Sequence, residues 1–95
     1  MIERHITFSV LPDRTRAFEH FVAGEYGKTM AKAPGFVKIE LLREADSTTR
    51  YQMVFRFVDA ESAAGWRTSQ VHVALQPALK ELNTDMQIQG YEVVG

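Results

Sequence analysis

The side chains best suited to chemistry lie close together in the middle of the chain: Trp66, Ser69 and His72. They follow one another at steps of three residues, and side chains three apart lie toward the same face of a helix. Histidine is the side chain whose ordinary pKa lies nearest neutral pH, so His72 can act as a general base or as a hydrogen-bonding group for a substrate. His72 also shares an apolar stripe with Leu75 and Leu79, and a structural histidine with one bonded nitrogen fits the same pattern.

Aromatic side chains supply the rest of the predicted site. Trp66 is the only tryptophan, and it either forms the floor of an aromatic pocket or fills the gap between helix and sheet. Tyr51 and Phe55 fall on one face of the preceding strand and are core residues by default, although a pocket for a small organic ligand is also mostly apolar. We therefore expect a substrate pocket between sheet and helices. Trp66 and His72 form its wall, Ser69 lies beside them, and Tyr51 or Phe55 lies at its base.

The composition excludes several other kinds of site. With 11 basic and 12 acidic residues the net charge is −1, so the chain has no electrostatic footprint for nucleic acid. It has no cysteine, and its three histidines lie on separate elements without a metal-ligand motif, so we expect no metal. No glycine-rich phosphate loop or dinucleotide fingerprint is present, so we expect no cofactor. Without an apolar run of ~20 residues or an apolar leader, a cytoplasmic protein with no membrane contact is expected.

The hydropathy pattern alternates between period two and helical spacing. Alternating apolar residues predict strands at 2–10, 36–43, 50–58 and 84–94. Helical spacing predicts helices at 13–32 and 60–82, the second broken near Thr68 and again at Pro77, which cannot continue a helix without losing a hydrogen bond. Asp59 and then Thr68 or Ser69 are the predicted N-caps of its parts.

The predicted helix at 13–32 is amphipathic. Asp13 is its expected N-cap, and its inward face is expected to include Val22, Glu25 and Met30. Gly24 and Gly27 weaken it by ~1 kcal/mol each relative to alanine, and they can permit close packing or a bend.

The order of elements is β-α-β-β-α-β, which is typical of the ferredoxin-like α+β fold with a four-stranded antiparallel sheet. We expect one domain over residues 1–95. The two helices cover one face of the sheet, and His5, Thr7, Val54 and Arg56 lie on the other. Arg56 is expected to pair with Glu40, and the alternative is that it anchors an anionic ligand. Because this second face is partly apolar, we expect a second copy to cover it in a homodimer.

Two segments resemble a known family. Ala33-Pro-Gly-Phe36 opens the second strand, and the third strand leads to the Trp66, Ser69 and His72 run, which continues to Leu75, Pro77 and Leu79. This arrangement is similar to the antibiotic biosynthesis monooxygenase-like family of the dimeric α+β barrel superfamily. The resemblance implies a dimer with its sheets packed face to face, and a pocket between helices and sheet in each subunit.

The resemblance also implies a range of functions. The first is a cofactor-independent monooxygenase acting on a small, aromatic organic substrate, with His72 as the base and with Trp66 and Tyr51 shaping the pocket. The alternatives are a non-catalytic ligand-binding or structural dimer and, third, a heme-binding protein. Heme-degrading relatives use an asparagine that falls near Arg4 and an axial histidine that falls near Gln76, so both positions argue against heme degradation.

Overall fold

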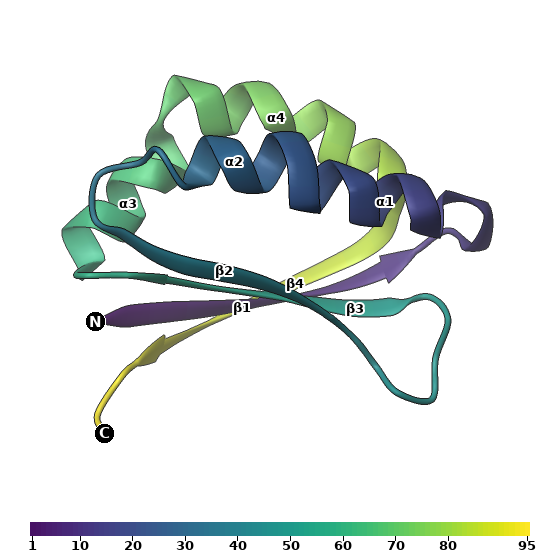
Figure 1. Ribbon diagram of the computed structural model, residues 1–95, viewed down its shortest axis with the longest axis horizontal. Coiled ribbons are helices and arrows are strands. Elements are labelled where there is room, and N and C mark those ends of the chain that lie inside the picture. Colours follow the sequence, from purple (N-terminus) through teal and green to yellow (C-terminus); the bar gives the residue numbers. More distant parts are fainter.

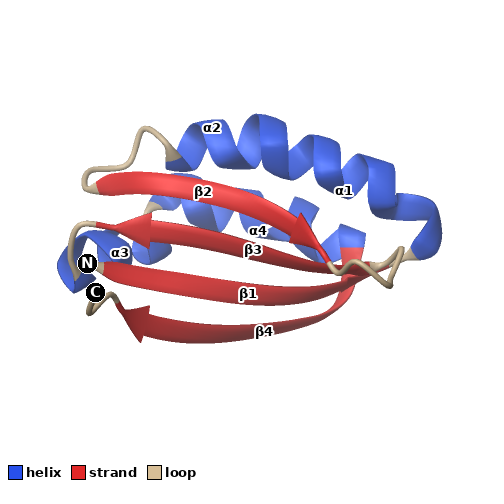
Figure 2. Ribbon diagram, turned by 60° about the horizontal axis from the view of Figure 1, so that its bottom comes forward, coloured by secondary structure: helices blue, strands red, loops and turns tan.

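The computed structural model describes residues 1–95 as two layers, with helices covering one face of an antiparallel sheet (Figure 1). The sheet has the order β2-β3-β1-β4, so β1 and β3 are central and β4 lies at an edge (Figure 2). The strands are β1 (Ile2–Val10), β2 (Phe36–Arg43), β3 (Arg50–Phe57) and β4 (Asn83–Glu92). This is the predicted ferredoxin-like α+β fold.

The first helical region runs without a break from Pro12 to Met30 but changes its winding. It consists of a 3-10 turn η1 (Pro12–Arg14), α1 (Thr15–Phe21), a π-helical turn η2 (Val22–Tyr26) and α2 (Gly27–Met30). The predicted Asp13 cap is wrong, because Asp13 lies within η1 and the first turn has no side-chain cap. The predicted inward position of Glu25 is also wrong: Glu25 is exposed, and Tyr26 is buried in its place.

The π turn explains which residues of this region are buried. The buried positions recur at steps of four: Phe18, Val22, Tyr26 and Met30. In a regular α-helix a residue four positions on lies about 40° further round, so three such steps would drift by about 120°. The wider turn at η2 removes much of that drift and keeps all four side chains on the sheet. Gly27 completes the turn by donating its N–H to the Val22 carbonyl.

Gly27 is the residue that the π turn requires. A Cβ at this position would lie 2.6 Å from the Val22 carbonyl oxygen, whereas a Cβ at Gly24 would meet nothing within 4 Å. We expect Gly27→Ala to lower the free energy of unfolding by about 1–3 kcal/mol, as overpacking usually does. Gly24→Ala is the matched control, and helix propensity predicts a change between zero and a gain of about 1 kcal/mol. Urea unfolding measures the free energy of unfolding of both variants. An equal change in Gly27→Ala and Gly24→Ala would contradict the special role of Gly27.

The second helical region begins with two caps that the sequence predicted. Asp59 Oδ1 accepts the Ser62 N–H at 2.8 Å at the start of α3 (Ala60–Thr68), and Ser69 Oγ accepts the His72 N–H at 3.2 Å at the start of α4 (Gln70–Leu82). The predicted break near Thr68 is confirmed, because Ser69 has extended backbone angles. The predicted break at Pro77 is wrong.

The helix α4 continues through Pro77 because its core contacts lie on both sides of that residue. Leu75 precedes Pro77, Leu79 and Leu82 follow it, and all three are buried. Pro77 itself is exposed. The missing backbone hydrogen bond is therefore offset by apolar burial before and after it.

The two faces of the sheet differ as predicted. The helix-covered face buries Tyr51, Met53, Phe55 and Phe57, and His5 pairs with Val54 on the open face. The predicted Arg56–Glu40 pair is wrong. Arg56 lies opposite Glu3 in the register and donates two hydrogen bonds to Glu3 Oε1, at 2.9 and 2.7 Å.

Candidate functional site

The structure brings the three predicted residues of the 66–72 run together. Trp66 is 3% exposed, and its ring centroid lies 4.9 Å from that of His72. Ser69 lies between them in the chain, and its hydroxyl donates to the Trp66 carbonyl at 2.8 Å while capping α4. Tyr26 joins this group from η2, with its ring centroid 5.9 Å from that of Trp66 and 6.4 Å from that of His72.

The indole N–H of Trp66 is the unusual polar group of this cluster. Its Nε1 atom is fully buried and has no hydrogen-bond partner in the protein. Buried polar groups in native proteins are nearly always bonded, and leaving one unbonded costs about 1–3 kcal/mol. A group that is kept at such a cost is a candidate for binding a ligand oxygen.

Trp66 also lies on the wall of a pocket. The pocket has a volume of about 630 Å³, within the usual range for small-molecule sites. It opens between the end of α2 with its following loop and the helices α3 and α4. The loop after α2 and the helix α3 lie at the left end of Figure 1. Its lining residues are Thr29, Lys32, Ala33, Pro34, Glu61, Ser62, Gly65, Trp66, Ser69 and Val71. The opening therefore lies between helical segments, whereas the sequence predicted one between helices and sheet.

His72 does not line this pocket, contrary to the prediction, and it uses both ring nitrogens within the protein. The Arg67 carbonyl lies 2.8 Å from Nδ1, and since a carbonyl can only accept, Nδ1 carries the proton. Nε2 then accepts a hydrogen bond from the Gln76 side-chain amide at 2.9 Å. In this arrangement the two ring nitrogens of His72 are held by the Arg67 carbonyl and the Gln76 amide.

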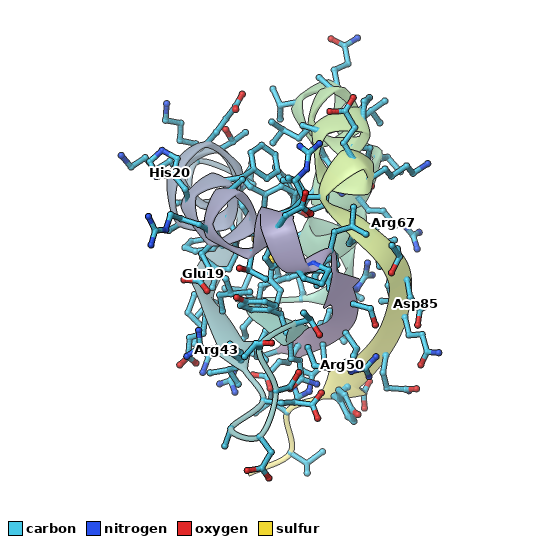
Figure 3. All side chains as sticks on the ribbon, turned by 90° about the vertical axis from the view of Figure 1, so that its right-hand side faces the viewer. Glu19, His20, Arg43, Arg50, Arg67 and Asp85 are labelled. Carbon is cyan, nitrogen blue, oxygen red and sulfur yellow. The ribbon has the colours of Figure 1, made fainter.

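Tyr51 and Phe55 do not line this pocket. Tyr51 is buried in β3, and its hydroxyl donates to Glu19, which also accepts from Arg43 at 3.5 Å. Figure 3 shows Glu19 and Arg43 on the side of the molecule where α1 lies over β2. Burial raises the pKa of Tyr51, and the Glu19 carboxylate raises it further. Phe55 packs against Phe57 in the core. Since neither Tyr51 nor Phe55 lines the pocket, a substrate-binding role for either residue stays a prediction.

Tyr26 is the site residue that sequence reasoning missed. The regular helical period placed Glu25 inward, and only the π turn buries Tyr26 in place of Glu25. A signal was present, because Gly24 and Gly27 flank this position and the large apolar residues recur at steps of four. Burial raises the pKa of Tyr26 to about 12; the Trp66 N–H nearby opposes this rise to a smaller extent, although it makes no hydrogen bond to Tyr26 within 3.5 Å.

The raised pKa of Tyr26 makes stability depend on alkaline pH. The unfolded tyrosine loses its proton near its ordinary pKa of 10, whereas the folded one keeps it up to about 12. Stability is therefore fully present below pH 10 and falls through this window, by about 3 kcal/mol at about 1.4 kcal/mol for each pKa unit. Urea unfolding at fixed pH values should show a steeper fall for the wild type than for Tyr26→Phe. Parallel curves would contradict the assignment.

The comparisons with known proteins identify the family. Residues 1–78 match the family model described as antibiotic biosynthesis monooxygenase. The chain belongs to the antibiotic biosynthesis monooxygenase family. No curated protein sequence matches it. No helix of this family member is long and apolar enough to cross a membrane, and no group of three or more histidine, aspartate and glutamate side chains is placed to hold a metal ion.

Solved structures share the fold of this family member over almost its whole length. A candidate antibiotic biosynthesis monooxygenase from Nitrosomonas europaea is 18% identical, with a TM-score of 0.86 and all of both chains covered. A mutant of SnoaB, a cofactor-independent oxygenase from Streptomyces nogalater, is 20% identical with a TM-score of 0.82, covering 97% of this chain and 91% of that one. A similar candidate from Bordetella bronchiseptica is 21% identical with a TM-score of 0.86, covering 98% and 96%. At these identities the likeness shows the fold alone.

Proposed function

We propose that the chain is a cofactor-independent monooxygenase that oxidises a small aromatic substrate in the pocket beside Trp66. The observation that carries this proposal is Trp66, which lines that pocket and whose indole N–H is buried without a hydrogen-bond partner in the protein. A donor in a site that excludes water favours a substrate oxygen on which negative charge develops. Membership of the family and the fold shared with SnoaB support the reaction type.

The reaction requires a substrate whose anion reduces oxygen directly. In an anthrone-type substrate, a CH₂ group next to an aromatic ring loses a proton to a base, and the carbanion is stabilised as an enolate. The anion gives electrons to O₂ and forms a C–O bond. Loss of water from the resulting hydroperoxide leaves a carbonyl, so CH₂ and O₂ become C=O and H₂O.

The proposed roles follow the positions of the side chains. Trp66 donates its N–H to the enolate oxygen, and Ser69 contacts the substrate from the same wall. Lys32 lines the pocket without an ion-pair partner, so its charge is available to the oxyanion. His72 packs against the Trp66 ring and does not line the pocket; it is the proposed base, and it becomes available when the Gln76 amide turns away from Nε2.

A second candidate function is the binding of an aromatic ligand without turnover. The observation that favours it is the complete bonding of the His72 ring, which leaves no free lone pair for a proton. In this case the Trp66 N–H still binds a ligand oxygen, and the pocket still selects a flat aromatic molecule.

Oxygen uptake with a defined probe tests the proposed reaction. We expect the wild-type protein to consume O₂ with 1,8-dihydroxyanthrone faster than the probe oxidises alone, and to form one anthraquinone for each O₂. Binding of 1,8-dihydroxyanthraquinone without any faster uptake would establish the second candidate. Neither binding nor uptake would contradict both.

We also propose that the chain is a homodimer that buries the open face of its sheet. Leu42 and Tyr91 are about half exposed on that face, and β4 is an edge strand. We expect the dimer interface to bury at least the usual ~1,600 Å². Sedimentation should therefore show a dimer at micromolar concentration. Leu42→Glu should weaken the dimer at least tenfold, whereas Val73→Glu on the exposed side of α4 should not. A wild-type monomer at that concentration would contradict the proposal.

A further inference from the structure

The ring of Tyr26 packs against both rings of the candidate site. Its centroid lies 5.9 Å from that of Trp66, with the two planes at 89°, and 6.4 Å from that of His72, with the planes at 69°. The Trp66 and His72 centroids are 4.9 Å apart, so the three rings form a closed group. Aromatic pairs at such separations attract one another edge to face.

The orientation of the Trp66 indole depends on packing alone. Its N–H has no hydrogen-bond partner in the protein, so no polar contact fixes the ring, whereas His72 is held at both ring nitrogens. Trp66 and His72 also lie on different helices, because the extended Ser69 separates α3 from α4. A ring from a third segment that packs on both therefore restricts how they move relative to each other, and Tyr26 supplies it from η2.

The π turn brings Tyr26 to this place. The wider winding of η2 buries Tyr26, whereas Glu25 before it is exposed. This winding depends on Gly27, since a Cβ there would lie 2.6 Å from the Val22 carbonyl oxygen. Single π turns inside helices are rare and frequently occur at functional sites. Here the departure from regular winding ends in a contact with the site.

We propose that Tyr26 is a positioning residue, whose ring holds the Trp66 indole in one orientation against His72. Tyr26 does not line the pocket, so it acts through Trp66. Its effect on turnover rests on the proposed function, but its effect on the indole ring does not. Because displacement of a reacting group by 1 Å can lower a rate about 100-fold, loss of the Tyr26 ring should lower kcat more than it changes KM.

Time-resolved fluorescence anisotropy of the ligand-free protein tests the orientation of the indole. The chain has one tryptophan, so the emission reports on Trp66 alone. We expect the wild-type anisotropy to decay only with tumbling of the whole protein. Tyr26→Leu should add a second, faster component from motion of the indole. Tyr26→Phe keeps the ring and should decay as the wild type does.

Phe18→Leu is the matched control. Phe18 is buried on the same helical face as Tyr26, and its ring packs against those of Phe8 and Tyr51. This variant also removes a buried ring from the core, so a general loosening of the core would appear in it as well. We expect Phe18→Leu to show a single decay component.

Oxygen uptake with saturating 1,8-dihydroxyanthrone measures the effect on turnover. Tyr26→Leu should lower kcat about tenfold or more with a smaller change in KM. Tyr26→Phe should restore most of the wild-type kcat, and Phe18→Leu should keep it.

Gly27→Ala and Gly24→Ala provide a second pair that keeps the test valid if Tyr26→Leu does not fold. An added Cβ at Gly27 forces the π turn to shift and Tyr26 with it, whereas a Cβ at Gly24 meets nothing within 4 Å. Gly27→Ala should therefore add the faster anisotropy component, and Gly24→Ala should not.

Four outcomes would overturn the proposal. A single decay component in Tyr26→Leu and Gly27→Ala would show that the indole is held without Tyr26. Equal faster components in Tyr26→Leu and Phe18→Leu would show a general loosening of the core. The same faster component in Tyr26→Phe would assign the effect to the hydroxyl group. A faster component in Tyr26→Leu with wild-type kcat would show that the orientation does not matter for turnover.

Failure of the proposed function gives a different result. A wild-type protein that consumes no O₂ with the probe would contradict the oxidation. The anisotropy decays of the ligand-free variants would still decide whether Tyr26 holds the indole.

Discussion

Replacing Trp66 by phenylalanine should weaken ligand binding about tenfold or more while leaving the fold intact. Phenylalanine keeps an aromatic ring in the core but lacks the unbonded N–H. The loss of apolar contact is offset by removal of a buried donor that costs about 1–3 kcal/mol. We therefore expect the free energy of unfolding to change by no more than about 1 kcal/mol. Binding of 1,8-dihydroxyanthraquinone should weaken by about tenfold or more, the effect of one lost hydrogen bond to a charged or strongly polarised oxygen.

Trp66→Ala is the matched comparison for this variant. It empties a fully packed position, and such substitutions cost about 3–5 kcal/mol. Urea unfolding and calorimetric titration separate the two contributions, because only the alanine variant loses the ring. If Trp66→Phe were destabilised as strongly as Trp66→Ala while binding the ligand normally, the indole N–H would have a structural role.

The second large effect concerns His72. If it is the base, His72→Ala should lower kcat for anthrone oxidation by about 10²–10⁴-fold, the usual contribution of general acid–base catalysis. Binding of the anthraquinone should change little, because the Trp66 N–H remains. The measurement is oxygen uptake at saturating probe, together with titration of the product.

Gln76→Ala distinguishes this role from a structural one. It removes the amide that occupies Nε2 and so frees the lone pair of His72. A catalytic His72 predicts that kcat for Gln76→Ala equals or exceeds the wild-type value. If kcat is instead unchanged in His72→Ala, and both variants lose about 0.5–1.5 kcal/mol of stability with the lost hydrogen bond, the ring is structural.

Local patterns were sufficient to predict most of the fold. Period-two alternation gave the bounds of β1 and β2 without error, and Asp59 and Ser69 cap their helices through interactions with residues three positions on. These features depend on neighbours in the chain. Pro77 failed as a helix breaker because burial of Leu75 and Leu79 on either side outweighs one lost hydrogen bond.

The site was less predictable because it depends on contacts between distant segments. Trp66, Ser69 and His72 come from one run, but the extended Ser69 separates α3 from α4, so the turn between the two helices brings the side chains together and helical spacing does not. Tyr26 reaches them only through the π turn, which the regular helical period does not show. Tyr51 has the right chemistry, but the register places it against Glu19 and away from the pocket.

The most direct test of the account is the indole resonance of Trp66. The chain has one tryptophan, so a ¹⁵N–¹H correlation spectrum contains a single indole N–H peak. Titration with 1,8-dihydroxyanthraquinone should move its proton signal downfield as the buried N–H acquires an acceptor, and the signal should saturate at the same concentration as calorimetric binding. An indole signal that stays in place while the ligand binds would show that Trp66 does not hold the ligand oxygen, and would contradict the proposed site.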